Sequence, residues 1–330
     1  MLVVGAGPIG LETAAVLAHE GLAVQIVDSG PLGATIARTF PPHTRFFTSP
    51  ERLSLFGLAI APLHQEKLTG EEYLAYLRQY VATHDLRVDT FTEILSGARQ
   101  PVKVVGRTLS GQRRVYSADT LVLATGGTDR PRRLGVPGED LPHVRSHLGD
   151  PHRYAGRRVV IVGGRNSAVE SALRCYRVGA HVHLVHRRSH IHERVKFWLR
   201  PEVQSLLDEG VITGHLPGEV SEITPEAVVL SDGRRLEADD VVLQIGYEQD
   251  GALFDMFGVP RDGVRKAPVI DPDTMRAAED LYVVGTATAG TQDRFEVFIE
   301  NSHDHAGRVA AALAGRAAPS PRPARPIPEV

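Results

Sequence analysis

The segment 2–28 constrains the fold of this chain more than any other part of it. It reads as a short apolar strand, a glycine-rich turn, a helix and a second strand. Gly5, Gly7 and Gly10 fit the G-x-G-x-x-G pattern, which allows a tight turn, a close approach to a pyrophosphate, and close helix–strand packing. Asp28 ends the second strand 23 positions after Gly5, near the roughly 20-residue interval at which an acid binds a ribose hydroxyl. The segment therefore predicts a βαβ unit with a dinucleotide site.

The same pattern returns about 160 residues later. The segment 158–185 again reads as strand, glycine turn, helix and strand. Because a chain with two such units usually binds two nucleotides, we expect an α/β protein with two Rossmann-like dinucleotide-binding domains. The second unit ends not in an acid but in the run 186–188, His-Arg-Arg. Guanidinium groups bind phosphate bidentately, so this run predicts the 2′-phosphate of NADPH, with a solvated basic face as the alternative.

Composition excludes several classes of protein. The 330 residues include 37 basic and 40 acidic side chains. The chain therefore lacks the overall basic excess that would indicate a nucleic-acid or membrane partner. Apolar runs are only strand-sized and the chain opens on a strand, so we expect a cytoplasmic protein without a signal peptide or membrane span. Cys175 is the one cysteine, which rules out a C-x-x-C redox pair. Arginines interleave with the histidines of 181–192, so we expect no metal site.

Other segments give expectations about the remaining fold. We expect a loop over 29–42 and an amphipathic helix over 69–84 that Thr69 caps. A helix over 197–209 is predicted to break or kink at its proline, and a long helix is predicted over 295–313. The proline- and arginine-rich stretch 317–330 reads as a disordered tail.

These motifs together resemble those of flavoproteins that bind two dinucleotides, and the resemblance spans essentially the whole chain. The thioredoxin-reductase branch is indicated by RPRRLGVPGE (130–139), but that branch carries a C-x-x-C that this chain lacks. The chain resembles more closely the cysteine-poor bacillithiol-disulfide reductase family. The segments that carry this likeness are FFTSPERLS (46–54), IVGGRNSAVESAL (161–173), IGY (245–247) and FIEN (298–301). Ile9 departs from that family, whose members have a cysteine in the first glycine turn, and Thr286 stands where an aspartate is common in the wider superfamily.

The resemblance implies FAD in the first domain and NADPH in a second domain inserted into it. The implied boundaries are 1–134 and 248–316 for the FAD-binding domain and 135–247 for the NADPH-binding domain. The implied FAD contacts are Gly5, Gly7, Pro8, Ile9, Gly10, Asp28, Ser29, Thr48, Ser49, Ile94, Thr125, Gly126, Gly285, Thr286 and Glu300. The implied NADPH contacts are Gly163, Gly164, Arg165, Asn166, Ser167, His186, Arg187, Arg188, Arg194 and Gly246.

The function that the resemblance implies is that of an NADPH-dependent flavoprotein which reduces a low-molecular-weight disulfide, bacillithiol disulfide first, directly from the flavin. His305 is the candidate acid–base residue, and a purely structural histidine is the alternative. Three other functions fit two nucleotide sites: a ferredoxin– or flavodoxin–NADP reductase, a flavin monooxygenase, and a redox sensor without turnover. The expected partner is a small disulfide or a small redox protein, and the expected assembly is a homodimer.

Overall fold

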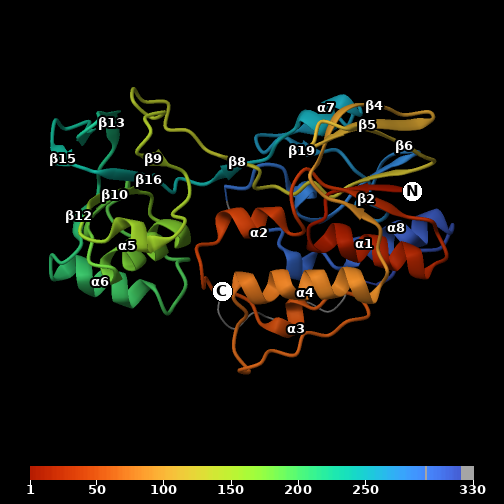
Figure 1. The fold of residues 1–330 in the computed structure, drawn as a ribbon, viewed down its shortest axis with the longest axis horizontal. Helices are drawn as coiled ribbons and strands as arrows, with labels where there is room; N and C mark the ends of the chain where they lie inside the picture. Colours follow the sequence, from red (N-terminus) through yellow and green to blue (C-terminus); the bar gives the residue numbers. More distant parts are fainter. Residues whose placement is uncertain (294–295, 321–330) are drawn as a thin grey trace. The chain divides into compact units, whose positions relative to one another are not determined.

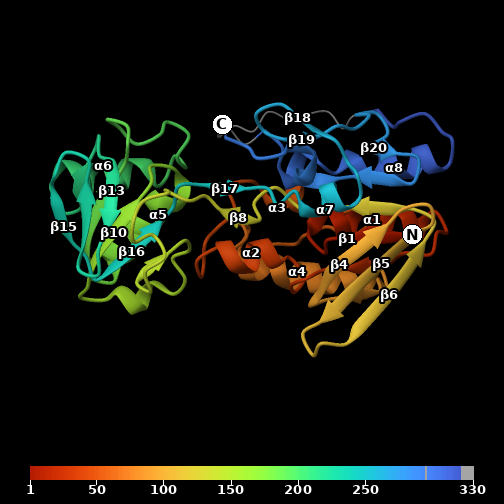
Figure 2. The same cartoon turned by 90° about the horizontal axis from the view of Figure 1, so that it is seen from above.

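The computed structural model describes residues 1–293 and 296–320, which form two compact units (Figures 1 and 2). Of the described residues, the first unit holds 1–38, 43–130 and those from 247 to 320. The second unit holds 39–42 and 131–246. The chain therefore leaves the first unit after Arg130 and returns to it at Tyr247.

A six-stranded sheet forms the centre of the first unit. Its order is β20 (Arg276–Ala278), β21 (Leu281–Val283), β7 (Leu121–Leu123), β1 (Leu2–Val4), β2 (Gln25–Val27) and β3 (Val88–Asp89), and all neighbours are parallel except β20 with β21. One face packs on an antiparallel sheet of β4 (Thr92–Ala98), β5 (Val102–Thr108) and β6 (Arg113–Ala118), and on α7 (Ala252–Met256). Two helices, α1 (Pro8–His19) and α8 (Asp304–Leu313), pack against each other.

The second unit repeats this plan on another parallel sheet. Its order is β12 (Thr213–His215), β11 (His181–Val185), β10 (Arg158–Val162), β16 (Asp240–Leu243) and β9 (Val144–Arg145). One face packs on α5 (Asn166–Arg177) and α6 (Arg200–Asp208), and the other on the antiparallel sheet of β13 (Val220–Ile223), β14 (Ala227–Leu230) and β15 (Arg235–Glu237). Because β1–α1–β2 and β10–α5–β11 share strand order and direction, the predicted internal duplication and the Rossmann-like fold class are confirmed.

Short elements complete the fold. They are α2 (Ala34–Thr39), α3 (Pro50–Leu53), α4 (Gly70–Thr83), β8 (Arg130–Pro131), η1 (Pro151–Tyr154), β17 (Tyr247–Glu248), β18 (Arg261–Asp262), β19 (Ala267–Pro268), η2 (Gly285–Ala289) and η3 (Ile299–Asn301). The Thr69 cap of α4 is confirmed: its hydroxyl accepts from the Glu72 N–H, while the Glu72 carboxylate accepts from the Thr69 N–H.

Three expectations about elements were wrong. The stretch 29–42 contains helix α2 rather than loop alone. The helix expected over 197–209 begins at Arg200, so Pro201 lies in its first turn, where a missing N–H costs nothing. The long helix expected over 295–313 is instead η3 followed by α8, because the Asn301 side chain bonds the backbone of Phe298 and Glu296 and closes a separate turn.

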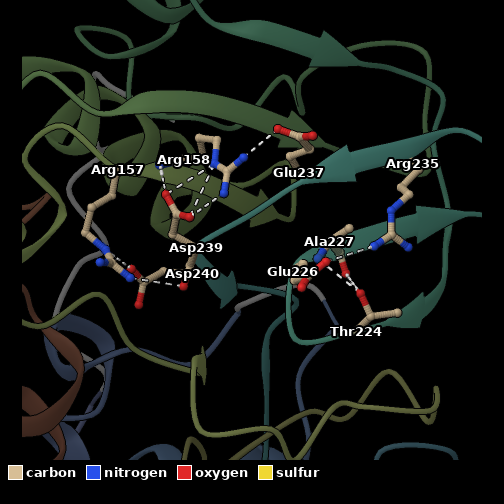
Figure 3. Close-up of polar contacts among 9 residues, drawn as sticks. All are labelled: Arg157, Arg158, Thr224, Glu226, Ala227, Arg235, Glu237, Asp239 and Asp240. Carbon is tan, nitrogen blue, oxygen red and sulfur yellow. Dashed lines mark hydrogen bonds and ion pairs between the residues drawn. The ribbon is translucent and has the colours of Figure 1, made fainter.

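Two aspartates fasten the amino end of β10 to β16 (Figure 3). The Asp239 carboxylate accepts from the Arg158 N–H at 2.8 Å, and the Asp240 carboxylate accepts from Arg157 Nε at 2.6 Å. Arg158 also pairs with Glu237 of β15 (Figure 3). These ion pairs lie at the opposite end of the strands from the glycine turn. They therefore leave the end that carries the glycine turn available to a ligand.

No helix among the described residues is long and apolar enough to cross a membrane. Residues 317–320 have no regular structure, and residues 321–330 of the predicted tail lie outside the described part of the chain.

Candidate functional site

The first glycine turn contains three glycines. The packing of the protein itself requires glycine at two of these positions but not at the remaining one. A Cβ on Gly5, whose φ is +112°, would lie 2.3 Å from the Ala124 carbonyl oxygen, and a Cβ on Gly10 would lie 2.1 Å from the Gly5 carbonyl oxygen. A Cβ on Gly7 would meet no protein atom within 4 Å. The chain's own packing explains the first and third glycines, whereas the second faces open space at the N-terminus of α1, where a pyrophosphate fits.

Asp28 lies where the sequence predicts, at the carboxyl end of β2. Its carboxylate accepts from the N–H groups of Ala6 at 2.6 Å and Gly30 at 2.7 Å. Burial raises the pKa of Asp28, and these two N–H groups oppose the shift. A carboxylate has about four lone-pair positions, so about two remain for ribose hydroxyls. Ser29 and Arg38 line an adjoining pocket of about 370 Å³.

Two hydroxyls provide an independent test of whether FAD fits here. The Oγ1 atoms of Thr48 and Thr125 are buried, and neither has a hydrogen-bond partner among the described residues. A buried polar atom without a partner costs free energy, so such groups usually have a ligand or water. Both residues are predicted FAD contacts. The residues present therefore fit a polar cofactor.

The Gly285 turn joins the first glycine turn. Gly285 has φ +70°, and a Cβ there would lie 3.1 Å from Ile9 Cβ, so Ile9 packs directly beneath this turn. Gln249 connects the turn after β7 with the turn after β21. Its Nε2 donates to the carbonyl oxygens of Gly126 and Ala287 at 2.9 and 2.8 Å. Ile94 packs with the core cluster beside the central sheet. Its role as an FAD contact stays a prediction.

His305 has a defined protonation state. Its Nδ1 accepts from the Gly285 N–H at 3.0 Å, so the ring proton lies on Nε2. Burial, with the nearby charge of Arg308, lowers the pKa of His305 to about 4, and the imidazole is neutral at pH 7. These facts give His305 a structural task, which is to hold the Gly285 turn. Its predicted acid–base role stays a prediction.

The second glycine turn resembles the first in geometry. Gly163 has φ +145°, and a Cβ there would lie 2.4 Å from the Gln244 carbonyl oxygen. A Cβ on Gly164 would lie 2.4 Å from the His186 ring, so His186 covers this turn. Gly246 follows β16 with φ +107°, next to Arg132. Asn166 begins α5, and its side-chain oxygen accepts from the Lys196 N–H at 2.7 Å.

Exposed arginines gather around the second turn. The positive charges of Arg165, Arg188 and Arg194 all lower the pKa of His192, after burial as the larger cause, which places these side chains near one another. Burial, with Arg187 and Arg188, lowers the pKa of His186 to about 4. The cationic cluster therefore adjoins the N-terminus of α5, as 2′-phosphate binding requires.

The histidines of the second unit do not form a metal centre in the described part of the chain, where no group of three His, Cys, Asp or Glu side chains could hold an ion. His183 Nδ1 and His215 Nε2 instead hydrogen-bond to each other at 3.0 Å. Sequence reasoning missed this pair, since its two members belong to different strands.

Cys175 is a packed core residue. It lies in α5, wholly buried, and burial raises the pKa of its thiol to about 12. Since the thiolate is the reactive form, we expect iodoacetamide to leave the native protein unlabelled at neutral pH and to label it once it is unfolded. Mass spectrometry of the two samples measures this. Labelling of the native protein at the rate of a free thiol would contradict the burial argument.

Asp129, in the turn after β7, makes the stability of the folded protein depend on pH. Burial raises the pKa of Asp129 to about 6, although the Asp250 N–H donates to its Oδ2 at 3.0 Å. The unfolded value is about 3.9, so the contribution of Asp129 to stability is fully present below that pH and is lost as the pH rises through about 6. We expect Asp129→Asn to stabilise the protein at pH 8 by at most about 3 kcal/mol, and less as the pH falls.

Denaturant unfolding at pH 8 and pH 5 measures that difference. Asp140→Asn is the matched control, because Asp140 is exposed and Arg133 lowers its pKa, so its effect has the opposite sign. A stability loss at pH 8 in the Asp129 variant would contradict the account.

The chain matches the family model described as pyridine nucleotide-disulphide oxidoreductase over residues 2–285. It is 30% identical to the bacilliredoxin reductase Bdr of Bacillus subtilis over 322 residues, which cover 96% of this chain and 97% of the relative. The structure of the bacillithiol disulfide reductase Bdr (YpdA) of Bacillus cereus matches with a TM-score of 0.89 and 31% identity, covering 95% of this chain and 98% of that one. A ferredoxin–NADP reductase of Ignicoccus hospitalis is 28% identical, covering 87% of this chain and 89% of the relative.

These matches confirm the resemblance to bacillithiol-disulfide reductases, and the ferredoxin–NADP reductases are the weaker alternative. The chain belongs to the pyridine nucleotide-disulphide oxidoreductase family and is an FAD- and NADPH-dependent oxidoreductase.

Proposed function

We propose that this chain reduces bacillithiol disulfide with NADPH, without a thiol of its own in the electron path. The net reaction takes one NADPH, one proton and the disulfide to NADP⁺ and two thiols. The observation that carries the proposal is a pair of glycine turns, each at the carboxyl end of parallel strands, in a chain whose one cysteine is buried. Relatives of the same length are named for a small disulfide and for a redox protein.

In the proposed arrangement FAD binds the first unit and supplies the two-electron chemistry. The open space at Gly7 and the α1 N-terminus receive the pyrophosphate, and Asp28 receives a ribose. The hydroxyls of Thr48 and Thr125 gain the hydrogen-bond partners that they lack among the described residues. Ile9 leaves the turn without a thiol, so the disulfide is reduced without a mixed disulfide to the protein at this position.

The second unit binds NADPH in this proposal. The α5 N-terminus at Asn166 faces the pyrophosphate, and the cluster of Arg165, Arg187, Arg188 and Arg194 neutralises the 2′-phosphate. His186 is neutral at pH 7 and covers Gly164, so it contributes shape rather than charge.

A ferredoxin reductase is the second candidate, because ferredoxin–NADP reductases also match most of the chain. An acidic protein partner needs available positive charge beside the flavin. Two bases around Thr48 are already engaged: Arg45 pairs with Glu66 at 2.6 Å, and Lys67 donates to the carbonyl oxygen of Phe47, the residue before Thr48, at 2.6 Å. This favours a small disulfide over ferredoxin. A flavin monooxygenase would form oxygenated product in step with NADPH oxidation.

Anaerobic stopped-flow spectroscopy tests the proposal. The protein is reduced with NADPH and mixed separately with bacillithiol disulfide, oxidised bacilliredoxin, oxidised ferredoxin and aerated buffer. We expect bacillithiol disulfide to restore the oxidised flavin spectrum fastest. Reoxidation by bacillithiol disulfide no faster than by air would reject this substrate, and rapid reoxidation by ferredoxin would establish the second candidate. Light scattering of the same sample tests the proposed homodimer.

A further inference from the structure

A buried ionisable pair joins distant parts of the first unit. Glu12 of α1 is 1% exposed, and His303, just before α8, is 7% exposed. Glu12 Oε2 lies 2.7 Å from His303 Nδ1. Neither residue belongs to the glycine motif, and the roles described so far use neither of them. A side-chain pair at this depth requires a definite proton arrangement.

The hydrogen-bond partners of Glu12 and His303 limit where the protons can lie. His303 Nε2 lies 2.8 Å from the Arg52 carbonyl oxygen, which only accepts, so Nε2 carries a proton. Glu12 Oε1 accepts from the Phe56 N–H at 2.9 Å, which favours the ionised carboxylate. The 2.7 Å contact between Nδ1 and Oε2 requires one proton between these two atoms. An imidazole nitrogen is a stronger base than a carboxylate oxygen, which favours that proton on Nδ1. In this arrangement both nitrogens of His303 donate, and the Glu12 carboxylate accepts from His303 and from the Phe56 N–H.

The charge of His303 acts on Glu300, three residues earlier. Burial raises the pKa of Glu300, and a backbone hydrogen bond opposes that shift, followed by the positive charges of His303 and Arg52. The other titratable groups around this cluster are Tyr73, Tyr76 and Tyr80 of α4, and Asp304, His305 and Arg308 of α8. His305 is neutral, so the α8 amino end holds one charged and one neutral imidazole two residues apart. The two imidazoles differ in charge because their hydrogen-bond partners differ. His303 faces two acceptors, the Glu12 carboxylate and the Arg52 carbonyl oxygen, whereas His305 faces a donor, the Gly285 N–H.

We propose that Glu12 and His303 form a permanently ionised buried pair, whose imidazolium opposes the protonation of Glu300, three residues earlier, beside the predicted FAD site. His303 is then a positioning residue that sets the charge at the flavin rather than a group that touches substrate. The part that concerns the flavin rests on the proposed function, because Glu300 is a predicted FAD contact. The ionised pair itself does not depend on that function.

Nitrogen-15 NMR of the histidine side chains in the full-length protein tests the pair. We expect one imidazole to keep protons on both nitrogens at pH 8, and its signals to vanish in His303→Gln. In Glu12→Gln, whose amide oxygen can still accept from the Phe56 N–H, that imidazole is expected to become neutral. An unprotonated Nδ1 on His303 in the wild type would overturn the proposal. If His303→Gln fails to fold, the wild-type and Glu12→Gln spectra decide the matter alone.

The flavin midpoint potential against pH tests the action on Glu300. In His303→Gln the pKa of Glu300 is expected to rise, so the potential gains a break with pH that the wild type lacks. His303→Gln combined with Glu300→Gln is expected to lose that break, because the titrating carboxyl is gone. A His303→Gln profile equal to that of the wild type would refute the charge-setting role. A protein that binds no FAD would reject the proposed function and leave the NMR result standing.

Discussion

A Gly7→Ala variant is expected to bind FAD about 10- to 100-fold more weakly, while its apoprotein unfolds at the wild-type temperature. The backbone of Gly7, at φ −77° and ψ 175°, suits alanine, and the new Cβ meets no protein atom within 4 Å. The methyl group instead enters the space that the pyrophosphate requires, and a steric conflict of that kind costs about 1–3 kcal/mol. FAD titration followed by flavin fluorescence and thermal unfolding of the apoprotein measure the two quantities.

Gly10→Ala is the contrasting variant, since its Cβ would lie 2.1 Å from the Gly5 carbonyl oxygen. We expect it to destabilise the apoprotein itself, by about 1–3 kcal/mol or more. The pair of variants separates what the cofactor requires from what the fold requires. Wild-type FAD affinity in Gly7→Ala would show that no pyrophosphate binds at this turn.

The double variant Arg187→Ala with Arg188→Ala is expected to lower kcat/KM for NADPH about 100-fold and to leave kcat/KM for NADH nearly unchanged. Each hydrogen bond to a charged group contributes about 1.5–3 kcal/mol, and solvent exposure of both arginines reduces that figure. Steady-state kinetics with both nucleotides measures the ratio.

Arg177→Ala is the matched control, because this exposed arginine pairs with Glu202 at 2.6 Å near the C-terminal end of α5, away from the glycine turn. We expect no change with either nucleotide in the control. Equal losses for NADPH and NADH in the double variant would place the 2′-phosphate elsewhere.

Local sequence rules predicted the parts of the fold that depend on neighbours along the chain. The glycine turns and the Thr69 cap of α4 both follow from residues a few positions apart. The repeat was visible because the same local pattern occurs twice. Pro201 was misread, since a proline in a helical pattern fits either a kink or a first turn, and only the position of Val203 against the core decides.

Contacts between distant residues were beyond such rules. Gln249, the pair of Glu12 with His303, and the Gly285 N–H bond to His305 join segments that no periodicity connects. The helix expected over 295–313 failed for a related reason. Asn301 and Ser302 both bond back to Phe298, so the chain closes η3 before α8 begins.

An anaerobic visible spectrum of the Cys175→Ala variant tests the central claim most directly. We expect a yellow protein that NADPH bleaches and that bacillithiol disulfide restores at the wild-type rate, because no protein thiol takes part. A colourless protein that stays so when FAD is supplied, or a bleached variant that the disulfide no longer reoxidises, would contradict it.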